Sequence, residues 1–195
     1  MLGNLARIPE TVRLALLRDP ARITAVLYED HDAEPPRPGF FARLFGRGAR
    51  TSMPTPADAR LPSVSNIDTL DIDKAWHGLH YLLTGDAWEG DFPQGFLVSC
   101  GQEVGDVDVG YGPARAFSAA QVKQIAAFLD GLDRGALRGR FDLDAMAKAD
   151  IYPDIWMSGE SADDLWQYVG GALDEVASFV RNTADRDMAL LVYLN

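Results

Sequence analysis

Residues 71–85 read DIDKAWHGLHYLLTG, and they predict the clearest helix in the chain. Apolar side chains recur at helical spacing on one stripe of this segment, which is formed by Ile72, Trp76, Leu79 and Leu83. Gly85 follows at the position where a glycine commonly ends a helix. We therefore expect a helix over 71–85 with one apolar face.

Further helices and strands are expected on both sides of this segment. Helical spacing or an N-capping residue predicts helices at 11–19, 23–27, 119–132, 143–147 and 161–184. Apolar runs predict strands at 1–8, 96–100, 114–117 and 188–194, whereas the glycine-rich, acidic stretch 103–113 reads as a loop. This order favours an α+β class, a single domain with a small mixed β-sheet packed by several helices, over an alternating doubly wound fold.

The composition is that of an ordinary folded protein. The chain has 195 residues, of which 47% are hydrophobic and 24% charged, and this length suffices for one domain with a real core. It contains no apolar run of about 18 residues that could cross a membrane, and its first residues lack the pattern of a secretory signal. Because Cys100 is the only cysteine and can form no internal disulfide, we expect a cytoplasmic location.

Charge is distributed unevenly along the chain. The formal net charge is -11, and residues 67–195 carry 22 acidic side chains against nine basic ones, whereas residues 1–66 carry seven against nine. This acidity argues against binding nucleic acid through its phosphates.

A proline- and arginine-rich loop or insertion is expected at about 30–66. Its basic, apolar part from Phe40 to Arg50 is expected to fold back on the acidic body, without stable membrane insertion.

Three stretches, the 71–85 segment among them, resemble the signature segments of a known family. DIDKAWHGLHYLLTG at 71–85, GYGPARAFS at 110–118 and DIYPDIW at 150–156 look like those of the YfbM-like proteins, and they occur in the same order. This resemblance implies a single α+β domain over 1–195 and a bacterial, cytosolic source. The family has no established activity, substrate or cofactor, so the chemistry has to be read from the residues.

The histidines of the 71–85 segment form the first candidate site. Asp73, His77 and His80 fall on one helical edge beside Trp76. Histidines at this spacing with a carboxylate one turn earlier could serve acid–base chemistry or bind a ligand or a metal ion. They could equally pack at the edge of the core and bond to the backbone. No HExxH motif or Cys/His cluster accompanies them, so no metal and no cofactor are predicted.

The second candidate is the turn that presents Tyr111 and Arg115. Gly110, Gly112 and Pro113 would make this turn rigid, and a guanidinium beside exposed amides can take a carboxylate or phosphate. Arg115 could instead pair with one of the many acids nearby, with Tyr111 covering the core. If the turn and the histidine helix line one cleft, a small-molecule pocket becomes the better interpretation.

Tyr152 and Trp156, in DIYPDIW, form a candidate interface, because buried Trp and Tyr side chains concentrate binding energy. They could also lock the loop onto its own core.

Three classes of function follow. The preferred one is a non-enzymatic binding or regulatory module that engages a protein partner through an acidic surface. The alternatives are an enzyme or small-molecule-binding protein centred on Asp73, His77, His80, Tyr111 and Arg115, and a self-associating domain; the oligomeric state stays open.

Overall fold

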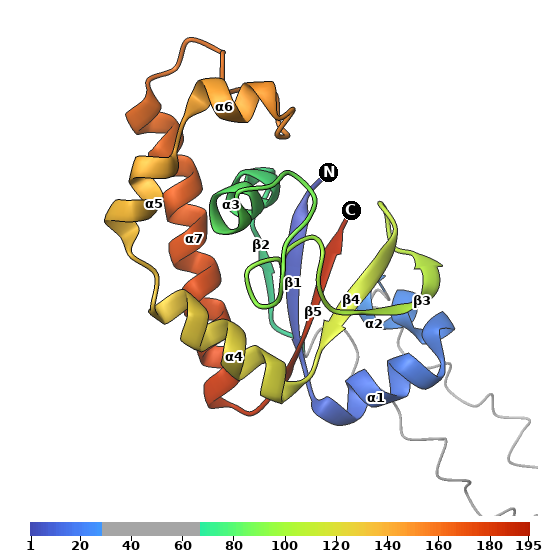
Figure 1. The fold of residues 1–195 in the computed structure, drawn as a ribbon. Coiled ribbons are helices and arrows are strands. Elements are labelled where there is room, and N and C mark those ends of the chain that lie inside the picture. Colours follow the sequence, from blue (N-terminus) through green and yellow to red (C-terminus); the bar gives the residue numbers. More distant parts are fainter. Residues whose placement is uncertain (29–66) are drawn as a thin grey trace, which may run out of the picture.

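A five-stranded sheet forms the centre of the protein. The computed structural model describes residues 1–28 and 67–195, and Figure 1 shows its fold. The strands are β1 (Gly3–Ile8), β2 (Thr69–Asp71), β3 (Gln102–Asp108), β4 (Pro113–Phe117) and β5 (Ala189–Leu194). Their order across the sheet is β2-β1-β5-β4-β3, and each neighbouring pair is antiparallel. β5 therefore lies between β1 and β4.

Both faces of β1 and β5 are covered, so nearly every residue of these two strands is buried. β1 and β5 pair over six residues each, from Gly3 opposite Leu194 to Ile8 opposite Ala189. Alternate side chains of a strand point to opposite faces, so Leu5 and Leu190 enter one buried cluster while Ile8 and Leu191 enter another. The sheet thus separates two hydrophobic cores.

Helices cover each face of this sheet (Figure 1). One layer consists of α1 (Glu10–Arg18), a 3₁₀ turn (Pro20–Arg22) and α2 (Ile23–Tyr28). The other contains α3 (Ala75–Thr84), α4 (Ala119–Asp130), α5 (Arg134–Arg140), α6 (Leu143–Lys148) and α7 (Ala162–Asp185). None of the described helices is long and apolar enough to cross a lipid bilayer.

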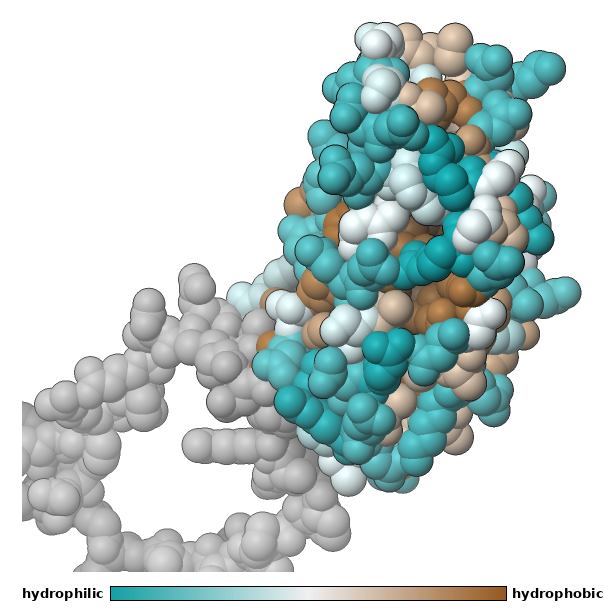
Figure 2. All heavy atoms as spheres, turned by 90° about the vertical axis from the view of Figure 1, so that its left-hand side faces the viewer, coloured by the Kyte–Doolittle hydropathy of each residue, from teal (hydrophilic) through white to brown (hydrophobic). Residues whose placement is uncertain are grey.

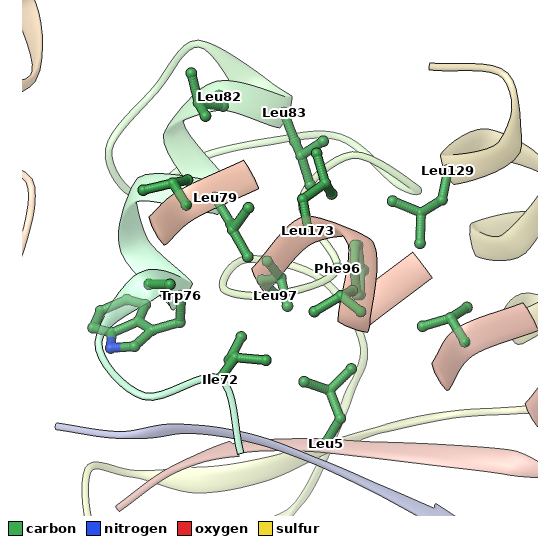
Figure 3. Close-up of a cluster of buried hydrophobic side chains, with 14 of the residues drawn as sticks. Leu5, Ile72, Trp76, Leu79, Leu82, Leu83, Phe96, Leu97, Leu129 and Leu173 are labelled. Atoms are coloured by element: carbon green, nitrogen blue, oxygen red, sulfur yellow. The ribbon is translucent and has the colours of Figure 1, made fainter. Parts of the chain in front are cut away.

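The larger core lies between the sheet and the second helical layer. Figure 3 shows Trp76 and Leu79 of α3 approaching Leu5 of β1 and Leu173 of α7. Phe96 and Leu97 reach the same core from the connection between α3 and β3. All of these side chains are almost completely buried.

The helix ends follow the capping chemistry of the sequence. The Ser118 hydroxyl accepts a hydrogen bond from the Gln121 amide, and the Gln121 side chain accepts one from the Ser118 amide, which completes a capping box. Asp142 and Ser161 cap α6 and α7. These three helix starts confirm the sequence prediction. Helix α5, capped by Asp133, was not predicted.

The predicted α+β class is confirmed, but the sheet is antiparallel among the described strands instead of mixed. The predicted strand at 96–100 is wrong, because the amides of Ser99 and Cys100 both donate to the Gly95 carbonyl and close a tight turn. The predicted loop at 103–113 is wrong in its first half, which forms β3 and pairs with β4.

The helix predicted over 71–85 begins only at Ala75 and ends at Gly85 as expected. Residues 69–71 instead pair with β1 as strand β2, and Asp73 has a positive φ of 50° that breaks the helical path. The insertion expected at about 30–66, with its segment Phe40 to Arg50, lies outside the described residues.

Candidate functional site

His77 is wholly buried on α3, and both of its ring nitrogens have partners. Nδ1 accepts a hydrogen bond from the Tyr152 amide at 2.9 Å, and Nε2 lies 2.7 Å from the Ala87 carbonyl oxygen. An acceptor role for Nδ1 leaves the proton on Nε2, which donates to Ala87. Burial lowers the pKa of His77 and favours this neutral form. The ring therefore ties α3 to two loops.

His80 is buried as completely as His77, but neither of its nitrogens has a hydrogen-bond partner among the described residues. Its burial, reinforced by the proximity of His77, lowers its pKa to about 4. His80 is thus neutral at pH 7 and lies close enough to Arg115 for the guanidinium to oppose its protonation.

Arg115 extends from β4 beneath the turn that follows Gly95. Its Nη2 donates to the Leu97 carbonyl at 2.9 Å, and its Nε is buried without a partner. Tyr111 has a different environment, since 59% of its surface is exposed and its amide bonds to Leu194 at the end of β5. The turn therefore directs Arg115 inward and leaves Tyr111 at the surface.

Asp73 and Trp76 also occupy different surroundings. The Asp73 carboxylate is exposed and accepts a hydrogen bond from the Tyr168 hydroxyl at 3.1 Å. Burial, together with this contact, raises the pKa of Tyr168 to about 12. Trp76 is buried in the larger core, where its ring stacks on His77 with centroids 4.7 Å apart. Asp73 thus bonds to α7, while Trp76 lies in the core.

The candidate interface residues pack mainly within the molecule. Trp156 is 2% exposed, and its indole nitrogen donates to the Ile151 carbonyl. Tyr152 is half-buried against Trp76, and its hydroxyl accepts a hydrogen bond from the N-terminal amine. Met157, the next residue after Trp156, is 66% exposed. The loop therefore buries its aromatic rings and presents Met157.

No three His, Cys, Asp or Glu side chains of residues 1–28 and 67–195 gather closely enough to hold a metal ion. His80 and Arg115 each carry buried side-chain nitrogens that have no hydrogen-bond partner among these residues. The hollows along α5, α6 and α7 are lined by other residues than Asp73, Trp76, His77, His80, Tyr111 and Arg115.

The strongest concentration of charge lies elsewhere, on α6, the loop that follows it and the first half of α7. Residues 141–175 contain nine carboxylates and one basic side chain, Lys148. All nine are exposed, and we call them the acidic surface: Asp142, Asp144, Asp150, Asp154, Glu160, Asp163, Asp164, Asp174 and Glu175. Only Asp163 and Asp174 of this set form ion pairs within the described part of the chain.

A hollow of about 580 Å³ opens within this acidic surface, between α5 and α7. We call it the α7 groove, and its main lining residues are Arg134, Asp163, Trp166, Gly170, Gly171 and Asp174. Figure 2 shows this side of the molecule, where hydrophilic residues surround smaller apolar areas. A second hollow, of about 350 Å³, lies between α6 and the loop carrying Met157.

Two arginines of α5 form ion pairs with carboxylates of the α7 groove. Arg134 pairs with Asp174, and Arg138 pairs with Asp163 at 2.6 Å. The Arg138 guanidinium also lies 5.5 Å from the Trp166 ring centroid and 5.6 Å from that of Phe141. These contacts hold a cation by stacking and by charge at once.

The sequence analysis missed the α7 groove. Trp166 falls at helical spacing with Val169 and Leu173, which predicts a core residue. The available signal was the pair Gly170–Gly171 in the middle of a long helix, where glycine lowers helix stability. Because α5 was not predicted from the sequence, Arg134 and Arg138 could not be placed opposite this part of α7.

Fold and surface together define an α+β protein with a five-stranded antiparallel sheet between two helical layers. A family model described as "Domain of unknown function (DUF1877)" matches residues 1–193, and the chain belongs to this family. No curated protein matches it. The expected YfbM-like relationship is confirmed, and the family's description assigns no activity.

A solved structure with the same fold is that of a protein of unknown function, YfbM from Escherichia coli. It superposes with a TM-score of 0.63 over 98% of each chain, at 18% sequence identity. At this identity the likeness shows the fold alone.

Proposed function

We propose that the protein is a non-enzymatic binding or regulatory module of the bacterial cytoplasm, which engages a basic protein partner through its acidic surface. The observation that carries this proposal is the ratio of nine exposed carboxylates to one lysine over residues 141–175. A surface with one sign of charge accelerates and selects the encounter with a partner of opposite sign.

Five of the nine carboxylates support a role outside the fold. Five carboxylates form no ion pair with any described residue: Asp144, Asp150, Asp154, Glu160 and Glu175. The remaining two carboxylates without an ion pair, Asp142 and Asp164, take part in helix capping contacts. Like charges placed together without counter-charges reduce the stability of the folded state. Their accumulation therefore favours a partner that neutralises them.

The alternative, an enzyme or small-molecule site around the histidines, has less support. Both ring nitrogens of His77 already form hydrogen bonds with the backbone of Tyr152 and Ala87. Tyr111 lies exposed beside the end of β5. Two of the five proposed pocket residues thus have other roles in the structure.

The proposal is tested by selecting peptides that bind the protein from a displayed library of random sequences. The selection is made at about 150 mM salt, where charges more than about 8 Å apart are screened from each other. We expect the wild-type protein to enrich peptides rich in Arg and Lys. A variant that combines Asp144→Asn, Asp150→Asn, Asp154→Asn and Glu160→Gln should lose this enrichment, because it removes four unpaired charges of the acidic surface.

The matched control combines Glu89→Gln, Asp91→Asn, Glu103→Gln and Asp106→Asn. It removes the same charge from exposed positions on the α3–β3 connection and on β3, outside the acidic surface. The control should select basic peptides as the wild type does. Equal loss in both variants would reduce the effect to net charge, and absence of enrichment with the wild type would overturn the proposal.

A further inference from the structure

The lining of the α7 groove combines an aromatic ring with acidic and basic side chains. Its lining contains an indole ring, three carboxylates and one arginine: Trp166, Asp163, Asp164, Asp174 and Arg134. The lining is therefore net negative even with Arg134 present. An aromatic face next to carboxylates is the chemistry that binds a guanidinium group.

The groove shows this chemistry with the protein's own side chain. The Arg138 guanidinium lies over the rings of both Trp166 and Phe141, while Nη2 donates a hydrogen bond to Asp163. Because Trp166 is only half-buried, its indole also forms part of the groove lining. The site thus binds one guanidinium internally and keeps aromatic surface available next to it.

The two glycines supply the space. A methyl group at Gly171 would meet no heavy atom within 4 Å, and one at Gly170 would lie 3.4 Å from the Trp166 ring. An alanine would therefore fit at either position and would favour the helix by about 1 kcal/mol. Packing within the described chain does not explain Gly171, whereas a groove that must admit another side chain does.

Resting on the proposed function, we propose that the α7 groove receives an arginine side chain from a basic segment of the partner protein. This guanidinium lies over the bare backbone at Gly170–Gly171, stacks against Trp166 and pairs with Asp164 and Asp174 of the rim. Asp174 then shares its charge between the partner and Arg134. The planar guanidinium suits this site better than an ammonium group, because it can stack and bond at once.

Binding of a fluorescein-labelled peptide of alternating arginine and glycine, followed by fluorescence anisotropy, tests the inference. Gly171→Gln places a side chain in the groove without disturbing packing, since the position is open. We expect it to raise the dissociation constant at least about tenfold, as expected for blocking a central contact. Replacing arginine by lysine in the peptide should also weaken binding to the wild type.

Gly139→Gln is the matched control, because Gly139 is also helical, exposed and without a heavy atom within 4 Å, but lies outside the groove lining. Its dissociation constant should stay within about twofold of the wild type, which is less than about 0.5 kcal/mol. Thermal unfolding of both variants establishes that they are folded.

The outcomes separate the two proposals. If the peptide binds the wild type and both glycine variants equally, the groove inference is overturned while the acidic surface stands as the binding site. If the lysine peptide binds as tightly as the arginine peptide, the stacking role of Trp166 is overturned. If neither peptide binds the wild type and the library selects no basic peptides, both the groove inference and the proposed function are overturned.

Discussion

His77 and His80 lie one helical turn apart on α3 and are equally buried, yet they are held in different ways. His77 bonds through both nitrogens, whereas neither nitrogen of His80 has a partner within residues 1–28 and 67–195. Sequence spacing could place the two rings on one edge, but it could not reveal which nitrogen meets a backbone group. Those partners come from Ala87 and Tyr152, and only folding brings Tyr152 to α3.

Replacement by leucine should separate these two histidines at pH 7. His77→Leu leaves the Tyr152 amide and the Ala87 carbonyl without their partner, so we expect a loss of about 1–3 kcal/mol in the free energy of unfolding. His80→Leu removes nitrogens that meet no hydrogen-bond partner within good geometry among the described residues, and its loss should stay below about 1.5 kcal/mol. Urea unfolding measures both values, and an equal loss would contradict the distinction.

Acid should destabilise the protein through His80. The pKa of His80 is about 4 in the folded state against an ordinary value of 6.5, so the unfolded chain binds more protons between these values. The free energy of unfolding should therefore fall as the pH drops from 6.5 towards 4, by up to about 3 kcal/mol. His77, whose pKa is also lowered, adds a loss of the same sign.

His80→Leu provides the test of this pH dependence. The variant should show a flatter decline between pH 6.5 and 4, measured by urea unfolding at each pH. A decline as steep as that of the wild type would assign the effect to other groups.

At the scale of elements, the connection between α3 and β3 shows how far the sequence could be read. Phe96 and Leu97 were correctly expected to be buried, but a short apolar run is compatible with a strand or with a turn. The hydrogen bonds from Ser99 and Cys100 to Gly95 close the turn. Gly95 itself approaches the backbone at Gly90, five residues earlier, and no spacing rule anticipates that contact.

Gly95→Ala should test this turn. A methyl group at Gly95 would lie 2.6 Å from the Gly90 carbonyl oxygen and 2.2 Å from the Ser99 hydroxyl, so the backbone must shift. We expect a loss of more than about 2 kcal/mol in the free energy of unfolding. Gly139→Ala, at an open helical position, should instead be neutral or stabilising. A tolerated Gly95→Ala would contradict the close approach.

The acidic strand β3 is a segment whose composition predicted a loop but which forms part of the sheet. Its glycine and aspartates are typical of loops, but pairing with β4 and burial of Val104 hold it in the sheet. The capping residues Ser118, Asp142 and Ser161 were predictable because their bonds are local. Long-range pairing is what the sequence could not specify.

For the whole molecule, the excess of negative charge makes folding sensitive to ionic strength. The net charge of -11 is concentrated beyond residue 66, and the acidic surface holds nine carboxylates of this part. Repulsion between them is strongest at low salt and is screened as salt is added. The candidate partner surface and the stability of the molecule therefore depend on the same charges.

The variant with four neutralised carboxylates of the acidic surface should be more stable than the wild type at low salt. The relief of repulsion is expected to be about 1 kcal/mol and to shrink as sodium chloride approaches about 1 M, where the Debye length is about 3 Å. Urea unfolding at both salt concentrations measures the difference. A difference that does not change with salt would point to altered packing in place of charge.

The position of β5 also governs how the newly made chain can fold. Strands β2 and β1 form one half of the sheet and β4 and β3 the other, and only β5 joins them. Since β5 comprises residues 189–194, both halves leave the ribosome before the strand that unites them. The edges of β1 and β4 that face β5 stay open until this strand inserts, so each half exposes a bare sheet edge to chaperones or to neighbouring chains during synthesis.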